Sequence, residues 1–121
     1  MHGILLIDKP YGYSAFQTVA TVKQLLRITK LGHGGTLDPL ATGMLPVCLG
    51  ESRKFAHHIL DADKCYTVRA QFGRKTTTLD MEGVCVAENT HHIVSYEEIA
   101  HAIQDFIGDV EQVPPAYSAL K

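Results

Sequence analysis

The chain has 121 residues, of which 45% are hydrophobic and 20% are charged, and its formal net charge is −2. This composition is typical of one soluble globular domain, and no apolar run approaches the roughly 20 residues of a membrane-spanning helix. The slightly negative charge argues against a simple polyanion-binding protein. No basic leader precedes the first strand-like run, so we expect a cytoplasmic protein.

The cysteine spacing and the distribution of charge along the chain give two further expectations. The three cysteines have no CxxC spacing, which indicates neither a disulfide framework nor a zinc site, and we expect all three to be small buried residues. Residues 53–75 carry six basic and two acidic side chains, whereas residues 80–111 carry eight acidic side chains and no lysine or arginine. One surface is therefore expected to attract phosphate and another to repel it, although ordinary solvated faces give the same pattern.

The first half of the chain alternates strand and helix signals. Residues 3–8 form a short apolar run typical of a buried strand. Ser14 is expected to cap a helix that reaches about Ile28, with its apolar face formed by Val19, Val22, Leu25 and Leu26. A loop is then predicted over residues 31–43, followed by a strand ending at Leu49 and a second helix that Ser52 caps.

The second half is predicted to contain two strands and one helix. Residues 65–72 alternate and predict a strand with Tyr66 on its apolar face, and residues 76–80 read as a polar link before a strand at 84–87. Ser95 and Glu98 form a capping box for a helix that Gly108 is expected to terminate. The order of elements predicts an α+β protein.

The central stretch, GHGGTLDPLATGMLPVCLG at residues 32–50, holds one carboxylate, Asp38. Its glycines permit positive φ and close approach, and Pro39 favours an extended conformation at Asp38. A lone aspartate in such a loop is more often a turn former or a helix N-cap. Here Leu37 precedes it and an apolar run follows, so we expect the carboxylate to be presented at the mouth of a core.

These residues carry a resemblance to a known family. The central stretch resembles the signature of the TruB-type tRNA pseudouridine synthases, relatives of dyskerin, in which the aspartate of the Leu-Asp-Pro motif is catalytic. Further motifs match in order: Lys9-Pro10-x-Gly12, Lys64-x-Tyr66, Thr76-x-Thr78-x-Asp80-x-x-Gly83 and Pro114-Pro115-x-Tyr117-Ser118-Ala119-Leu120-Lys121. Two positions depart from the pattern, since Ala15 stands where a serine is common and Gly34 where a threonine is common.

The resemblance implies a fold and a domain organisation. We expect the α+β pseudouridine synthase fold with a mixed, largely antiparallel sheet that is incomplete on its C-terminal side. Residues 1–121 would be the N-terminal portion of the catalytic domain. The rest of that domain and a C-terminal RNA-binding domain would be absent, and the full-length protein is expected to be a monomer.

The resemblance also implies an activity and a site. The expected reaction converts uridine to pseudouridine at position 55 in the T loop of tRNA, with no cofactor and no metal. Asp38 and Tyr66 are the expected catalytic residues, although Tyr66 also fits an ordinary core aromatic. The expected RNA-binding residues are His33, Gly35, Thr36, Leu37, Lys9 and Lys64. His33, which lies between glycines, would stack on or hydrogen-bond a flipped nucleotide, and Arg53 and Lys54 are further candidates for phosphate contacts.

Several alternatives stay open at this stage. The carboxylate can add covalently to the sugar or base, or it can abstract the 2′-proton to give a glycal. In the family an arginine from the later half pairs with the aspartate, and no position here matches it. Two rival functions are an inactive RNA-binding or tRNA-folding module and a carboxylate-dependent hydrolase, for which Asp80 is the candidate second carboxylate.

Overall fold

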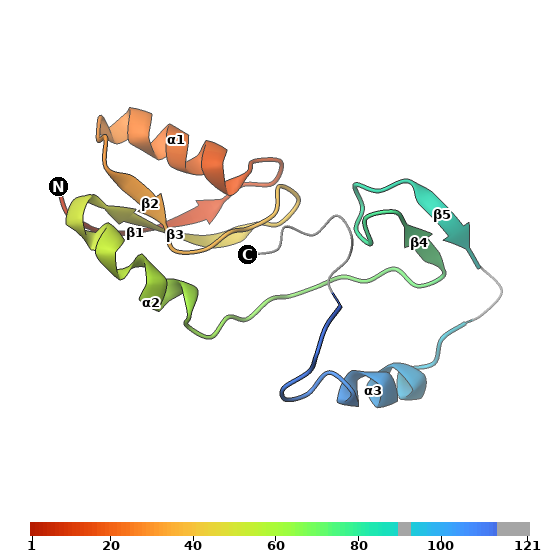
Figure 1. Ribbon diagram of the computed structural model, residues 1–121. Coiled ribbons are helices and arrows are strands. Elements are labelled where there is room, and N and C mark those ends of the chain that lie inside the picture. The colour runs from red at the N-terminus through yellow and green to blue at the C-terminus, as the bar shows by residue number, and fades with distance from the viewer. Residues whose placement is uncertain (90–92, 114–121) are drawn as a thin grey trace. The chain divides into compact units, whose positions relative to one another are not determined.

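The computed structural model describes residues 1–89 and 93–113, which fall into two units divided after Tyr66 (Figure 1). The first unit contains β1 (Gly3–Lys9), α1 (Ala15–Leu26), β2 (Leu31–His33), β3 (Gly43–Leu49), the 3-10 helix η1 (Gly50–Phe55) and α2 (Ala56–Leu60). The second contains β4 (Arg74–Thr76), β5 (Cys85–Glu88) and α3 (Tyr96–Gln104). Antiparallel strands and separate helices make this an α+β protein, as predicted. None of the described helices has the length and apolar character needed to span a membrane.

The first unit is built on a three-stranded antiparallel sheet in the order β1-β3-β2. Strand β1 pairs with β3 along its full length, from Gly3 opposite Leu49 to Lys9 opposite Gly43. The short strand β2 pairs with the end of β3, so β2 is an edge strand. Figure 1 shows α1 on one side of this sheet and α2 on the other.

The core lies between the sheet and α1. Because side chains alternate along a strand, Leu45, Val47 and Leu49 share one face of β3, and all three are buried with Ala15 of α1. The partly buried residues packed against this cluster are Leu5, Ile7, Val19, Leu31 and Leu37. The loop residue Leu37 is therefore anchored in the core of the first unit.

Helix α1 begins where the sequence predicts. The Ser14 side chain accepts a hydrogen bond from the backbone N–H of Gln17, and the Gln17 side chain accepts one from the Ser14 N–H, which completes a capping box. The helix ends earlier than expected, because Arg27 adopts a left-handed conformation with φ 53°. Its buried residues include Thr18 and Val22, whereas Leu25 is 75% exposed, so the predicted apolar face was rotated.

The opposite face of the sheet is only partly covered. Ile4, Leu6 and Met44 are 53%, 61% and 65% exposed, and they occupy the alternate positions of β1 and β3 that point away from α1. A shallow groove in this region is lined by Leu6, Ile7, Asp8 and Met44. An apolar sheet face of this kind normally packs against a further layer of structure.

Two local predictions in the first unit were wrong. The predicted loop at 31–43 begins with strand β2, since Leu31 to His33 pair with β3. Ser52 does not cap a helix, because the helical segment η1 already begins at Gly50. The N-cap residue of η1 is Leu49, whose side chain makes no capping hydrogen bond. The sharp turn at Gly50, with φ 61°, starts the helical segment directly after the strand.

The second unit contains an antiparallel hairpin and a helix. Strand β4 pairs with β5 from Arg74 opposite Glu88, so the predicted strand at 84–87 is confirmed within one residue. The Ser95 side chain accepts from the Glu98 N–H and the Glu98 carboxylate accepts from the Ser95 N–H, which confirms the predicted capping box of α3. Helix α3 ends at Gln104, before Gly108.

The predicted strand at 65–72 was also wrong, because this segment has no regular secondary structure. A strand needs a partner for its backbone N–H and C=O groups, and no described strand pairs with this segment. Cys65 and Cys85 are exposed, which contradicts their predicted burial, whereas Cys48 is buried as expected. Burial raises the pKa of the Cys48 thiol, so this side chain stays neutral.

Candidate active site

The loop between β2 and β3 turns Asp38 outward while its neighbours hold it in place. Leu37 packs against the core cluster, whereas the next residue, Asp38, is exposed. The Ala41 N–H donates to the Asp38 carbonyl oxygen at 3.0 Å, which closes a turn with Pro39 in its favoured second position. No hydrogen bond or ion pair to the Asp38 carboxylate is formed within the described part of the chain. The carboxylate is therefore presented on an anchored loop.

The Lys9 side chain fixes the same loop from the end of β1. Lys9 is fully buried, and its Nζ donates to the carbonyl oxygens of Pro10 at 3.1 Å, Tyr13, and Pro39 at 3.3 Å. The Gly12 N–H donates to the same Pro39 oxygen at 2.8 Å. A buried ammonium group needs such partners to offset its loss of water. Lys9 is therefore not positioned for the RNA phosphate contact expected of it, because its ammonium group is buried and hydrogen-bonded to backbone carbonyl groups of the loop.

His33 is the last residue of β2 and leads into the loop. Its side chain is half-buried, and its Nδ1 atom is buried without a hydrogen-bond partner among the described residues. Most buried polar atoms in native structures have a partner, so this nitrogen is a candidate for an interaction with a ligand or with residues outside the described part. The histidine lies on the strand that enters the Asp38 loop, as its sequence position suggests.

The glycine that follows His33 is required by close packing. The Gly34 N–H donates to the Pro46 carbonyl oxygen at 2.9 Å, and a Cβ on Gly34 would lie 2.9 Å from Cβ and Cγ2 of Ile59 in α2. Of the four glycines within residues 32–43, only Gly43 has a positive φ, at 123°. The sequence did not identify Ile59 as a neighbour of the loop, because no spacing rule connects it to Gly34.

The other predicted RNA-binding residues are Gly35, Thr36 and Lys64. Gly35 is half-buried, and no heavy atom lies within 4 Å of the position its Cβ would take, while Thr36 is exposed. The Lys64 Nζ donates to the carbonyl oxygens of Leu60 and Ala62, so it satisfies the C-terminal end of α2. Both residues of the Lys64-x-Tyr66 motif lie in the exposed segment that follows this helix.

Tyr66 does not lie on an apolar strand face as predicted. Its side chain is 61% exposed, and no hydrogen bond or ring contact with it is present among the described residues. Among the described residues, no hydrogen bond or ring contact joins Tyr66 to Asp38 or His33. Its expected catalytic role stays a prediction.

Asp80 organises the turn of the β4–β5 hairpin. Its carboxylate accepts hydrogen bonds from the Thr78 hydroxyl at 2.6 Å and from the Glu82 N–H at 2.9 Å. These two bonds lower the pKa of the Asp80 carboxyl group below its ordinary value. A carboxylate with this local turn function needs no catalytic role to explain its position, which weakens the hydrolase interpretation. No group of three or more potential metal ligands occurs within residues 1–89 and 93–113.

Comparison with known proteins shows the family to which this chain belongs. The family described as "TruB family pseudouridylate synthase (N terminal domain)" matches residues 23–121. The chain belongs to this family, as its motifs indicate.

Individual relatives agree with this assignment. A protein of Cupriavidus metallidurans named tRNA pseudouridine synthase B is 50% identical over all 121 residues, and one of Colwellia psychrerythraea with the same name is 51% identical. The chain spans only 38% of the length of each relative. A chain in the crystal structure of a Cbf5–Nop10–Gar1 complex is 30% identical with a TM-score of 0.68, over 98% of this chain and 31% of that one.

Proposed function

We propose that this chain supplies the catalytic aspartate of a tRNA pseudouridine synthase and that Asp38 is that residue. The observation that carries the proposal is the position of Asp38 in its loop. Leu37 anchors the loop in the core, and Lys9 and Gly12 fix the Pro39 carbonyl, while the Asp38 side chain remains exposed. Membership of the TruB family supports the class of reaction.

The reaction breaks the bond between C1′ and N1 of uridine, rotates the base and joins C1′ to C5, after which C5 loses its proton and N1 carries one in the product. An ionised carboxylate can assist by adding to the sugar or base, or by removing the 2′-proton. Both routes require close contact with one nucleotide, and both are compatible with an exposed Asp38. His33, which is half-buried at the end of β2 where the Asp38 loop begins, is the residue we assign to contacting the displaced base.

The proposed substrate is the uridine at position 55 in the T loop of tRNA. The names of the relatives from C. metallidurans and C. psychrerythraea support tRNA as the RNA. Because the chain covers 38% of these relatives, we further propose that it is the N-terminal portion of a longer catalytic domain. The exposed apolar residues Ile4, Leu6 and Met44 support this organisation.

A full-length chimera provides the test. This chain would replace the matching 38% of the C. metallidurans relative, and tRNA labelled with tritium at C5 of uridine would report conversion through tritium release. The Asp38→Asn variant keeps the shape of the side chain but removes its charge, so it should abolish tritium release while the dissociation constant for tRNA changes only a few-fold. Conversion by the Asp38→Asn variant would contradict the assignment.

The position of modification needs a separate substrate control. A tRNA in which cytidine replaces uridine 55, still labelled at its other uridines, should release no tritium. Release from that tRNA would contradict the T-loop assignment but leave the class of reaction intact. Binding without any conversion of the natural tRNA would favour the alternative of an RNA-binding or tRNA-folding module.

A further inference from the structure

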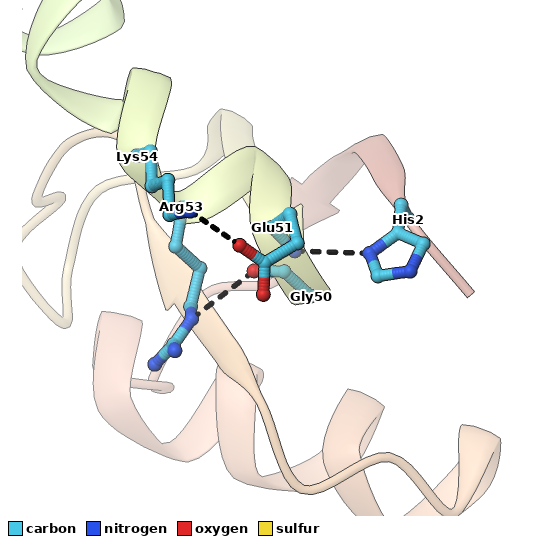
Figure 2. A network of polar contacts seen from close by, with 5 residues as sticks. All are labelled: His2, Gly50, Glu51, Arg53 and Lys54. Atoms are coloured by element: carbon cyan, nitrogen blue, oxygen red, sulfur yellow. Dashed lines mark hydrogen bonds and ion pairs between the residues drawn. The ribbon is translucent and has the colours of Figure 1, made fainter.

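A second polar network lies at the junction between β3 and η1, at the opposite end of β3 from Gly43 (Figure 2). The Glu51 N–H donates to Nδ1 of His2 at 3.0 Å, and the Arg53 Nε donates to the Gly50 carbonyl oxygen at 3.2 Å. The Glu51 carboxylate pairs with the Lys54 Nζ at 2.7 Å. These contacts connect the N-terminal residues to the first turn of η1.

Gly50 is the residue on which this network depends. Its φ of 61° is a left-handed conformation, and a Cβ at this position would lie 2.7 Å from the Met1 carbonyl oxygen as well as against the His2 ring. Only glycine fits here without displacing the N-terminal residues. His2 therefore packs directly on the turn that holds the Arg53 side chain.

Arg53 is held at two points but keeps free donors. Its Nε is bound to Gly50, and its aliphatic stem lies against Gly32, since a Cβ there would be 3.6 Å from Arg53 Cγ and Cδ. Figure 2 shows the end of the guanidinium directed away from His2 and Glu51. Among the described residues, no hydrogen bond or ion pair involves its two Nη groups. The side chain is therefore oriented in advance, with two parallel donors available.

Several other basic side chains of the first unit are more committed than Arg53. Lys9, at the opposite end of β3, is buried among carbonyl groups, the Lys64 Nζ binds two carbonyl oxygens, and the Lys54 Nζ pairs with Glu51. Nearby basic side chains nevertheless act together, because the hydrogen bond from Lys54 and the charges of Lys30 and Arg53 lower the pKa of the Glu51 carboxyl group. The junction is thus an electropositive corner of a chain whose net charge is −2.

A phosphodiester is the ligand that this geometry fits. Two Nη groups of a guanidinium can donate to two oxygens of one phosphate, and an arginine oriented in advance loses little rotamer entropy on binding. Gly32, against which Arg53 lies, directly precedes His33 on the edge strand β2. An RNA whose displaced base contacts His33 would bring its backbone to the same edge of the sheet.

We propose that Arg53 binds a backbone phosphate of the substrate RNA and that His2, through the first turn of η1, positions it. This inference rests on the proposed function only for the identity of the RNA. The positive charge of Arg53 contributes to the affinity for RNA. The fixed orientation of its guanidinium makes a further contribution to that affinity, which a lysine at this position would not make.

The test measures tRNA binding by the full-length chimera between 50 and 200 mM salt. Arg53→Gln should weaken binding and reduce the slope of log affinity against log salt by about one, since one phosphate contact is lost. Arg53→Lys should keep most of the slope but bind more weakly than the parent, because lysine lacks the two-pronged donor. Lys23→Gln is the matched control, since it removes one charge from α1 on the other side of the sheet.

The role of His2 is tested by a double-mutant cycle. His2→Ala should weaken tRNA binding when Arg53 is present and have no additional effect in the Arg53→Gln background. An unchanged slope in Arg53→Gln, or an equal change in Lys23→Gln, would overturn the phosphate contact. Additive effects of the two substitutions would overturn the positioning role. Failure of the parent chimera to release tritium would contradict the proposed function instead, and the binding titration would still decide the role of Arg53.

Discussion

The Nζ atom of Lys9 donates a hydrogen bond to the carbonyl oxygen of Pro39, 30 residues further along the chain and directly after Asp38. This contact connects the end of β1 to the loop between β2 and β3. The same oxygen accepts from the Gly12 N–H, so the turn after β1 and the Asp38 loop form one hydrogen-bonded unit. Two residues of one motif therefore hold a residue of another motif that lies far away in the sequence.

Replacement of Lys9 should affect stability and turnover more than RNA binding. Lys9→Met removes the ammonium that serves three carbonyl groups, and we expect the free energy of unfolding to fall by about 2 to 4 kcal/mol. Turnover by the chimera should fall because the Asp38 loop loses a support, while the tRNA dissociation constant changes little. Chemical denaturation and a binding titration measure both. Weakened binding with unchanged stability would restore the phosphate contact first expected of Lys9.

The contact between Gly34 and Ile59 predicts a compensating pair of substitutions. Gly34→Ala would place its Cβ 2.9 Å from Ile59, and we expect a destabilisation of about 1 to 3 kcal/mol from overpacking. Combined with Ile59→Ala, the cost should be smaller than the sum of the two single substitutions. Denaturation of the four chains measures this interaction energy. Gly35→Ala is a suitable control, because no heavy atom lies within 4 Å of its Cβ position, and strict additivity for Gly34 and Ile59 would disprove the contact.

The turn at Asp80 should respond to acid. The hydrogen bonds from Thr78 and Glu82 lower the pKa of Asp80 in the folded hairpin, so their stabilisation is fully present above the unfolded value of about 3.9. It is lost as the pH falls through the lower, folded pKa. The Glu82 amide resonance should therefore titrate below pH 4, and Asp80→Ala should remove that titration. A titration at or above the ordinary aspartate value would contradict the turn geometry.

The isolated 121-residue chain should be nearly inactive. Exposed Ile4, Leu6 and Met44 leave an apolar sheet face open, and such faces favour aggregation or binding of a hydrophobic dye. Adding the C-terminal portion of the C. metallidurans relative as a separate chain should restore tritium release and sharpen thermal unfolding. Addition of the same portion to the Asp38→Asn chain controls for its own activity. Cooperative melting and full turnover by the 121-residue chain alone would refute the partial-domain proposal.

Local signals in the sequence determined much of the secondary structure. Ser14 with Gln17 and Ser95 with Glu98 each form a capping box in which both hydrogen bonds lie within four residues, so neighbouring side chains suffice to predict these helix starts. The apolar run at 3–8 correctly predicted the strand β1, although its pairing partner β3 lies 40 or more residues away along most of its length. The motif around Asp38 identified the family, since its residue types and spacing do not depend on the fold.

Contacts between distant residues were decided only by the tertiary structure. The alternating residues 65–72 formed no strand, because a strand requires a partner that a local pattern cannot supply. Lys9 resembled a surface cation in the sequence, yet the fold buries it where three carbonyl groups converge. The sequence by itself determined that Asp38 would be presented on a loop. Only the folding of β1, β3 and α2 around that loop decided which residues hold it, because hydrogen bonds and packing across a sheet join positions that no spacing rule connects.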